Sequence, residues 1–488
     1  MVAPPRRRRT AWSASFALVS ALVLASAPAS AQSFQELSPQ VRAFTASDAT
    51  HFILRDVTLI DGTGAPARTG MSVVVRDGVI EAVGPADKVG EPEGAEVVDG
   101  AGHTLIPGLV MLHEHLFYPS GRDWRGARYN THELSFPPLY LAGGVTTMRT
   151  GGSVDPYTDL GVRDDVAAGR IPGPRIDVTG PYLEGPGGFI RAFPELTTPQ
   201  EARDHVDFWM DRGVTSFKAY NLITREVLET AIDAAHARGA EVTGHLCSIT
   251  YAEAAELGID NLEHGFFAAT DWSPGKEPDQ CVGTPTSVFL ELELDGRPFL
   301  DVVDALVEHE VALTSTLNVV ERSVPGRPLP PDGAQAAIEP ALRADVMASV
   351  AAGAAGQRRP AAWLEKIMAM EKAFYDRGGL LVAGIDPTGA GDVVPGYGNQ
   401  RTIQLLLEMG LSVEEAVRVV TLNGATYLER ADEVGTVEVG KRADLVLMSG
   451  DLRSDPETVR RMRLVFKDGV AYDSPALFES VRGTVGIR

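Results

Sequence analysis

Residues 105–115 read LIPGLVMLHEH, an apolar run that ends in two histidines separated by one residue. Such a run is typical of a buried parallel strand, because strands covered on both faces are almost continuously apolar. Side chains alternate across a strand, so His113 and His115 face the same side. We therefore expect a buried strand that presents two imidazoles at its carboxyl end.

Short apolar segments separated by helical stretches follow this strand along the chain. Their alternation favours a (β/α)8 barrel, a TIM-like α/β fold, over an open doubly wound sheet. The clearest helix covers residues 225–238 and stops before Gly239, as helices commonly do. No GxGxxG motif follows the first strand, so a dinucleotide-binding fold has no support. The seven further strands are predicted at 145–149, 175–179, 215–220, 241–245, 261–264, 311–316 and 380–385.

Both ends of the chain have a sequence pattern that is typical of antiparallel sheets. Residues 71–83 and 463–472 each place an Asp-Gly pair between two apolar runs, which predicts two hairpins. We predict a small β-sandwich domain assembled from residues 51–107 and 433–488. These two segments flank the barrel, which we assign to residues 108–432.

The N-terminal 31 residues predict a signal peptide. Four arginines at 6–9 precede an apolar run at about 12–25, and Ala29-Ser30-Ala31 resembles a cleavage site. The apolar run is shorter than the ~20 residues that a spanning helix needs. We therefore expect export to the periplasm or the medium, with no membrane span after cleavage. In an oxidising compartment Cys247 and Cys281 could form a disulfide; two buried thiols are the alternative.

The composition is that of a globular protein with a strongly acidic balance. The formal net charge is -22, which argues against nucleic-acid binding because such proteins carry a basic surface. A small-molecule substrate is expected instead. The sequence leaves the oligomeric state open, a homo-oligomer included.

Polar residues end four of the other predicted strands. They are Lys218, His245, His264 and Asp386. Active sites of barrel enzymes lie at the carboxyl ends of the strands, so these side chains and the two histidines would meet at one mouth. Each residue alone is explained more simply as a hydrogen-bonded core or turn residue. Together, imidazoles and a carboxylate suit a borderline metal such as Zn²⁺.

With these motifs the chain resembles the amidohydrolase superfamily, over about residues 51–472. The Lys-x-Tyr pattern is similar to that of a subgroup with imidazolonepropionase-like and metal-dependent dipeptidase-type members. Where that subgroup often has Gly-Gly-His after the third strand, this chain has Gly187-Gly188-Phe189. The stretches that carry the resemblance are 106–115, 217–220, 242–245, 262–265, 383–386 and 435–446.

The resemblance implies two divalent metal ions, with zinc expected, and a role for each polar strand end. Lys218 would be an N6-carboxylysine, which is chemically reasonable because burial favours the neutral amine that carbamate formation needs. Asp386 would also be catalytic, taking a proton from the attacking water and passing it to the leaving group. The implied ligands are His113, His115 and Asp386 for one ion, His245 and His264 for the other, and Lys218 as a bridge.

Two further residues are candidates for contact with the substrate. Tyr220 lies two residues past Lys218 and so faces the same mouth, where it could donate to a developing oxyanion or be a packed aromatic. Arg191 could bind a substrate carboxylate, but a surface arginine is the simpler explanation.

The sequence therefore predicts a metal-dependent amidohydrolase that cleaves a C–N bond of a dipeptide or N-acyl amino acid. One alternative is a mononuclear cyclic amidase, lactonase or deaminase of the same superfamily, which would not need Lys218. A non-catalytic binding barrel is a third possibility, but a complete ligand set has no structural purpose there.

Overall fold

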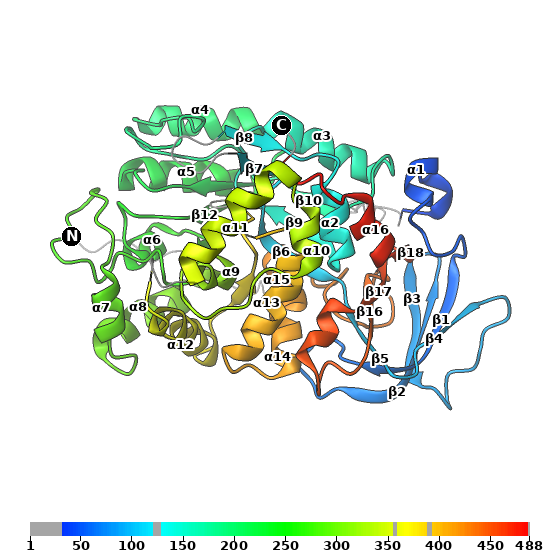
Figure 1. The fold of residues 1–488 in the computed structure, drawn as a ribbon. Helices are drawn as coiled ribbons and strands as arrows, with labels where there is room; N and C mark the ends of the chain where they lie inside the picture. The colour runs from blue at the N-terminus through cyan, green and yellow to red at the C-terminus, as the bar shows by residue number, and fades with distance from the viewer. Residues whose placement is uncertain (1–31, 121–127, 355–358, 388–392, 487–488) are drawn as a thin grey trace, which may run out of the picture. The chain divides into compact units, whose positions relative to one another are not determined.

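The computed structural model describes residues 32–120, 128–354, 359–387 and 393–486 (Figure 1). The predicted signal peptide, residues 1–31, lies outside the described residues. The described chain has an α/β fold that combines parallel sheets with a mostly antiparallel one. Within the described ranges, no helix is both long enough and apolar enough to cross a bilayer.

All eight strands predicted for the middle of the chain are present, in two parallel sheets. Their apolar residues are buried, as the near-continuous apolar runs indicated. The three-stranded sheet has the order β10 (Arg175–Asp177), β9 (Val145–Thr150), β6 (Leu109–Glu114). The five-stranded sheet has the order β11 (Ser216–Ala219), β12 (Glu241–Gly244), β13 (Asn261–Glu263), β14 (Ala312–Ser315), β15 (Leu381–Ala383).

Hydrogen bonds connect the two parallel sheets at both of their edges. Beyond β10, the amide of Gly180 donates to the carbonyl of Ser216 at 2.8 Å. Beyond β15, the amides of Ile385 and Asp386 donate to the carbonyl of His113 at 3.2 and 3.0 Å. The backbone of Asp386 is thereby fixed beside the strand that carries the first two histidines.

Helices separate the parallel strands in sequence. The helix predicted at 225–238 is confirmed as α5, whose Val227, Leu228 and Ile232 are buried and which Gly239, with φ of 74°, follows. The helices up to β14 are α1 (Pro39–Arg42), α2 (Phe136–Ala142), α3 (Pro156–Ala167), α4 (Pro199–Met210), α5 (Arg225–Ala237), α6 (Tyr251–Leu257), α7 (Thr286–Glu291) and α8 (Arg297–Glu308). Those after it are α9 (Leu317–Glu321), α10 (Asp332–Ala337), α11 (Pro340–Ala354), α12 (Ala362–Asp376), α13 (Tyr397–Glu408), α14 (Val413–Arg418), α15 (Gly424–Tyr427) and α16 (Ser474–Ser480).

Both terminal regions join in one eight-stranded sheet, in which β5 (His103–Pro107) from the N-terminal region pairs with β16 (Leu445–Ser449) from the C-terminal region (Figure 1). The rings of Phe52 on β1 and Phe466 on β17 lie 5.5 Å apart although two strands separate β1 from β17, so the sheet curves around its own core. The strand order is β18 (Val470–Asp473), β17 (Met462–Lys467), β16 (Leu445–Ser449), β5 (His103–Pro107), β1 (His51–Leu59), β2 (Arg68–Arg76), β3 (Val79–Pro85), with β4 (Glu96–Asp99) also paired to β1.

The two Asp-Gly hairpins are confirmed between β2 and β3 and between β17 and β18. Asp77 and Gly78 have φ of 48° and 85°, and Asp468 and Gly469 have φ of 52° and 79°. Two successive positive φ angles are those of a type I′ turn, whose twist matches that of the flanking strands.

The prediction of one parallel strand over residues 105–115 is wrong at its start. Residues 105–107 belong to β5, which pairs with β16 in the antiparallel sheet, and the parallel strand β6 begins only at Leu109. The chain changes sheets at Gly108, where a Cβ atom would lie 2.2 Å from the Thr146 hydroxyl oxygen. Only glycine allows this close approach. The apolar run by itself did not show that the chain leaves one sheet and enters another at this residue.

Candidate metal centre

The six candidate ligands meet where the parallel strands end. His113 and Lys218 lie within β6 and β11, and the other four follow the ends of β6, β12, β13 and β15. Most of these side chains are buried, while His245 and Asp386 retain partial exposure. We call His113, His115, Lys218, His245, His264 and Asp386 the ligand cluster.

Three members of the cluster form a compact donor group. The possible ligand atoms of His113, His115 and Asp386 all lie within 4.8 Å of one another. Asp386 Oδ1 is 3.3 Å from His115 Nε2 and 3.8 Å from His113 Nε2. One small cation could therefore reach a donor atom from each of the three side chains.

The remaining three members lie against this group. The imidazole of His264 is 4.5 Å, centroid to centroid, from that of His113 and 4.4 Å from that of His245. The amine of Lys218 lies 3.1 Å from His113 Nε2. The second carboxylate oxygen of Asp386 is 3.8 Å from His264 Nδ1. All six predicted residues are thus brought together.

Hydrogen bonds orient two of the imidazoles for metal binding. Nδ1 of His113 donates to the Glu263 carboxylate at 2.7 Å, and Nδ1 of His115 donates to the Gly152 carbonyl at 3.3 Å. A proton on Nδ1 leaves the lone pair on Nε2. In both residues Nε2 faces the cluster, which is the orientation that a metal-binding histidine needs.

Glu263 is the residue behind the cluster that the sequence did not assign. Its buried carboxylate also accepts hydrogen bonds from Arg149 at 2.7 Å and from Thr243. Burial alone would raise the pKa of Glu263, but His113 and Arg149 hold it well below its usual range. Arg149, on β9, therefore also lies behind the cluster.

The sequence did not predict a role for Glu263 because this residue directly precedes His264. Adjacent residues of a strand normally face opposite sides, so a ligand role for His264 placed Glu263 outward. His264 lies just beyond β13 with φ of 69°, a left-handed conformation that is uncommon for residues other than glycine. The chain turns there, and both side chains point into the same region.

The protonation states suit a divalent cation. Burial lowers the pKa of His115 to about 4 and that of His245 to about 3, so both imidazoles are neutral near pH 7. Burial by itself would raise the pKa of Asp386, but the hydrogen bond from His115 and the nearby His113 hold it well below normal. Burial lowers the pKa of Lys218 to about 8, which makes the neutral amine accessible.

A cavity of about 480 Å³ opens beside the cluster. His245, His264 and Asp386 line it, and so does Tyr220, whose ring centroid is 5.0 Å from that of His245. Seven aromatic residues, which we call the aromatic wall, are among the lining residues: Phe117, Tyr129, Tyr182, Phe189, Phe193, Tyr220 and Phe267. Only Tyr220 of these was a candidate from sequence, because the others lie outside the parallel strands, in loops and on a short hairpin whose placement no local pattern encodes.

Phe189 and Arg191 both lie on the loop after β10, but only Phe189 is among the residues that line the cavity. Arg191 is exposed, and the residues that line the cavity include its neighbours Ile190 and Phe193 but not Arg191 itself. Phe189, at the position where the resembling subgroup often has histidine, lines the cavity. This loop therefore supplies apolar groups to the cavity.

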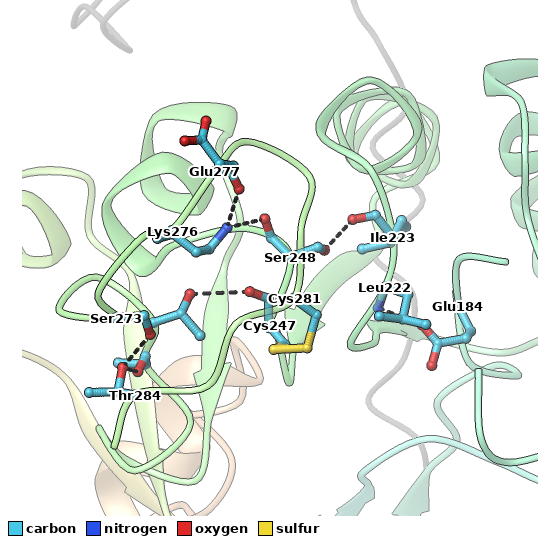
Figure 2. Close-up of a disulfide and its surroundings, with 12 residues drawn as sticks. Glu184, Leu222, Ile223, Cys247, Ser248, Ser273, Lys276, Glu277, Cys281 and Thr284 are labelled. Atoms are coloured by element: carbon cyan, nitrogen blue, oxygen red, sulfur yellow. Dashed lines mark hydrogen bonds between the residues drawn. A yellow bond between two sulfur atoms is a disulfide. The ribbon is translucent and has the colours of Figure 1, made fainter. Parts of the chain in front are cut away.

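A disulfide between Cys247 and Cys281 fastens the segment after β13 to the loop that follows His245 (Figure 2). This settles the two alternatives left by the sequence. Lys276 donates to the Ser248 carbonyl at 2.6 Å, and the Ser248 hydroxyl donates to the carbonyl of Ile223. Because Cys281 lines the cavity, the disulfide holds part of its wall.

Comparisons with known proteins agree with this geometry. The family model described as the amidohydrolase family matches residues 104–472. The imidazolonepropionase of Micrococcus luteus is 28% identical over 418 residues, which cover 80% of this chain and 90% of that protein.

Solved structures show the same α/β fold. A bottromycin amidohydrolase has a TM-score of 0.66 at 21% identity, covering 91% of this chain and 94% of its own. A Xaa-Pro dipeptidase with bound methionine has a TM-score of 0.63 at 18% identity, covering 87% and 100%. Since the family model spans most of the chain, the protein belongs to the amidohydrolase family and is a metal-binding hydrolase that acts on carbon–nitrogen bonds.

Proposed function

We propose that the protein is a binuclear amidohydrolase that cleaves the amide bond of a dipeptide or an N-acyl amino acid. The observation that carries this proposal is the position of Lys218, whose amine lies 3.1 Å from His113 Nε2 inside a cluster of four histidines and one aspartate. A buried lysine among imidazoles has no evident structural purpose. As an N6-carboxylysine it would supply two oxygen donors between two ions.

The ligands divide into the two groups that the geometry suggests. His113, His115 and Asp386 would hold one ion, zinc by our expectation, and His245 and His264 would hold the second. Such ions lower the pKa of a water molecule and polarise the scissile carbonyl. Glu263 and Gly152 keep the imidazoles of His113 and His115 in the required orientation.

Two side chains would act on the reacting groups. Asp386, ionised and facing the cavity, would take a proton from the attacking water and pass it to the leaving nitrogen. Burial raises the pKa of Tyr220, so its hydroxyl stays protonated and could donate to the developing oxyanion.

A mononuclear cyclic amidase, lactonase or deaminase is the second candidate. In the described part of the chain, His113, His115 and Asp386 form the group of three or more donors close enough to share one ion. This candidate is supported by the position of His245 and His264, which lie outside that group of three donors.

Finer features of the fold belong to the same proposal. The hydrogen bonds at both edges of the parallel sheets support a closed (β/α)8 barrel for residues 108–432. The curvature of the eight-stranded sheet supports a β-sandwich built from residues 51–107 and 433–488. Export with removal of residues 1–31 is supported by the disulfide, since disulfides persist in oxidising compartments.

Metal content per chain, measured by elemental analysis beside amide hydrolysis, tests the proposal. We expect two ions in the wild type and a loss of one or both in Lys218→Ala. The matched control is Lys372→Ala, which removes a lysine paired with Asp376 on the surface. One ion in the wild type would favour the mononuclear candidate, and none after reconstitution with divalent metal and bicarbonate would contradict both.

A further inference from the structure

The aromatic wall is assembled from separate parts of the chain. Phe117 lies on β7 (Phe117–Ser120) and Tyr129 on β8 (Arg128–Thr131). Tyr182, Phe189 and Phe193 follow β10, whereas Tyr220 and Phe267 follow β11 and β13. Aromatic residues are few in this protein, 7% of the chain, so their concentration around one cavity calls for an explanation.

The rings of the wall pack on one another. Tyr182 and Phe193 are stacked with centroids 3.7 Å apart, and Phe193 meets Tyr220 edge to face at 5.1 Å. Phe117 and Tyr129 form a second pair at 5.6 Å. Tyr182 and Phe193 are buried. The wall is therefore preorganised, and a ligand that binds it needs to order few side chains.

The wall begins at the ligand cluster itself. Phe117 lies 4.5 Å from the His115 ring, and Phe267 lies 5.2 Å from the His264 ring, centroid to centroid. Tyr220 is 5.0 Å from His245. A substrate group packed against the wall would thus be the group next to the scissile bond.

The chemistry of the lining favours an uncharged, flat apolar group. Its other members include Ile190, Leu222 and Val319, and the lining residues that the structure describes include no arginine or lysine. Aromatic groups gain from offset or edge-to-face packing with such rings as well as from removal of their surface from water.

We propose that this cavity selects amides that carry an aromatic ring on the group adjacent to the scissile bond. This inference rests on the proposed function and narrows its substrates to aromatic N-acyl amino acids or dipeptides. In the reaction water supplies a hydroxyl to the acyl carbon, the C–N bond breaks, and a proton goes to the leaving nitrogen. The products are a carboxylic acid and an amine, which ionise to a carboxylate and an ammonium group near neutral pH, so no co-reactant is needed.

Matched substrates test the selection. We expect kcat/KM for either N-acetylphenylalanine or N-benzoylalanine to exceed that for N-acetylalanine at least ~10-fold, the lower end of what hydrophobic pockets discriminate. Phe189→Ala should bring that ratio toward one. Phe208→Ala, on the exposed surface of α4, is the matched control and should leave the ratio unchanged. A wild-type ratio near or below one would overturn the inference.

Binding to a non-hydrolysing variant separates this inference from the proposed function. Isothermal calorimetry of Asp386→Asn should show tighter binding of at least one of the two aromatic compounds than of N-acetylalanine, and Phe189→Ala in that background should abolish the difference. If no amide is hydrolysed but this preference is present, the proposed function fails and the aromatic selectivity stands. Equal affinities for the three compounds would contradict the selectivity itself.

Discussion

The ligand cluster and the aromatic wall border the same cavity, but different forces hold them. Members of the cluster sit at strand ends, where backbone hydrogen bonds such as that from Asp386 to the His113 carbonyl fix their positions. The wall is assembled from loop segments and the short hairpin of β7 and β8, and it is held by ring packing, while the disulfide fastens a neighbouring part of the cavity lining. The difference suggests that separate parts of the molecule determine reaction chemistry and substrate choice. Substitutions in the ligand cluster should change the rate or metal binding, whereas substitutions in the aromatic wall should change substrate selectivity.

The largest effect is expected from Asp386→Asn. The amide keeps the shape of the side chain but cannot take the proton, so kcat should fall ~10²–10⁴-fold, the usual contribution of general acid–base catalysis. Steady-state kinetics on the preferred amide measure this. Asp376→Asn, on the surface of α12, is the control. A loss below tenfold with metal retained would contradict the assigned role.

Tyr220 belongs to both regions, so Tyr220→Phe sharpens the comparison. Removing the hydroxyl leaves the ring in the wall, and loss of one oxyanion donor costs ~10²–10³-fold in kcat. We expect a lower kcat with KM nearly unchanged. Tyr182→Phe, which removes a hydroxyl elsewhere in the wall, should have little effect on kcat. Equal effects of the two substitutions would mean that Tyr220 acts only as a packed aromatic.

Glu263→Gln tests the group behind the cluster. The glutamine can still contact His113, but it no longer offers a carboxylate to the imidazole or to Arg149. Substitutions of such supporting groups lower metal affinity ~10–100-fold. Metal retention against increasing chelator measures the change, with exposed Glu479→Gln as the control. Identical chelator curves would rule out a positioning role.

Glu371→Gln should affect stability rather than chemistry. The fully buried carboxyl lies against Gly265, and burial raises its pKa to about 8. Because the unfolded chain loses this proton near its ordinary pKa of 4.5, the folded state is favoured below that pH and progressively less favoured up to about 8. At ~1.4 kcal/mol for each pH unit above 4.5, glutamine should add roughly 3 kcal/mol to the free energy of unfolding near pH 7 and little near pH 4.5. Urea unfolding at both pH values measures this; an equal gain at both would contradict it.

The smallest effect is expected from Cys281→Ser. Without the disulfide, the segment after β13 remains attached through Lys276 and its partners, so the wall should loosen only locally. We expect KM to rise a few-fold with kcat and metal content unchanged. Reduction of the wild type should reproduce the change and add nothing in the variant. A large fall in kcat would show that the two regions are not separable.

Much of the ligand cluster could be predicted because its polar residues stand at the ends of apolar runs that predict strands. Apolar runs alternating with helical stretches predicted the eight strands, and His, Lys or Asp at the ends of five of them predicted the six residues that the structure brings together. The errors lie where local pattern and geometry diverge. Gly108 splits one apolar run between two sheets, and the turn at His264 lets Glu263 face inward.

By itself the sequence determined the parallel strands, the Asp-Gly hairpins and the positions of the candidate ligands, since these follow from residue spacing and turn chemistry that act over a few residues. Only the tertiary structure decided that Cys247 pairs with Cys281, that Arg149 and Glu263 support His113, and that rings from distant segments line one cavity. Those contacts join residues far apart in the chain, and their partners are fixed by packing in three dimensions, which has no local signature.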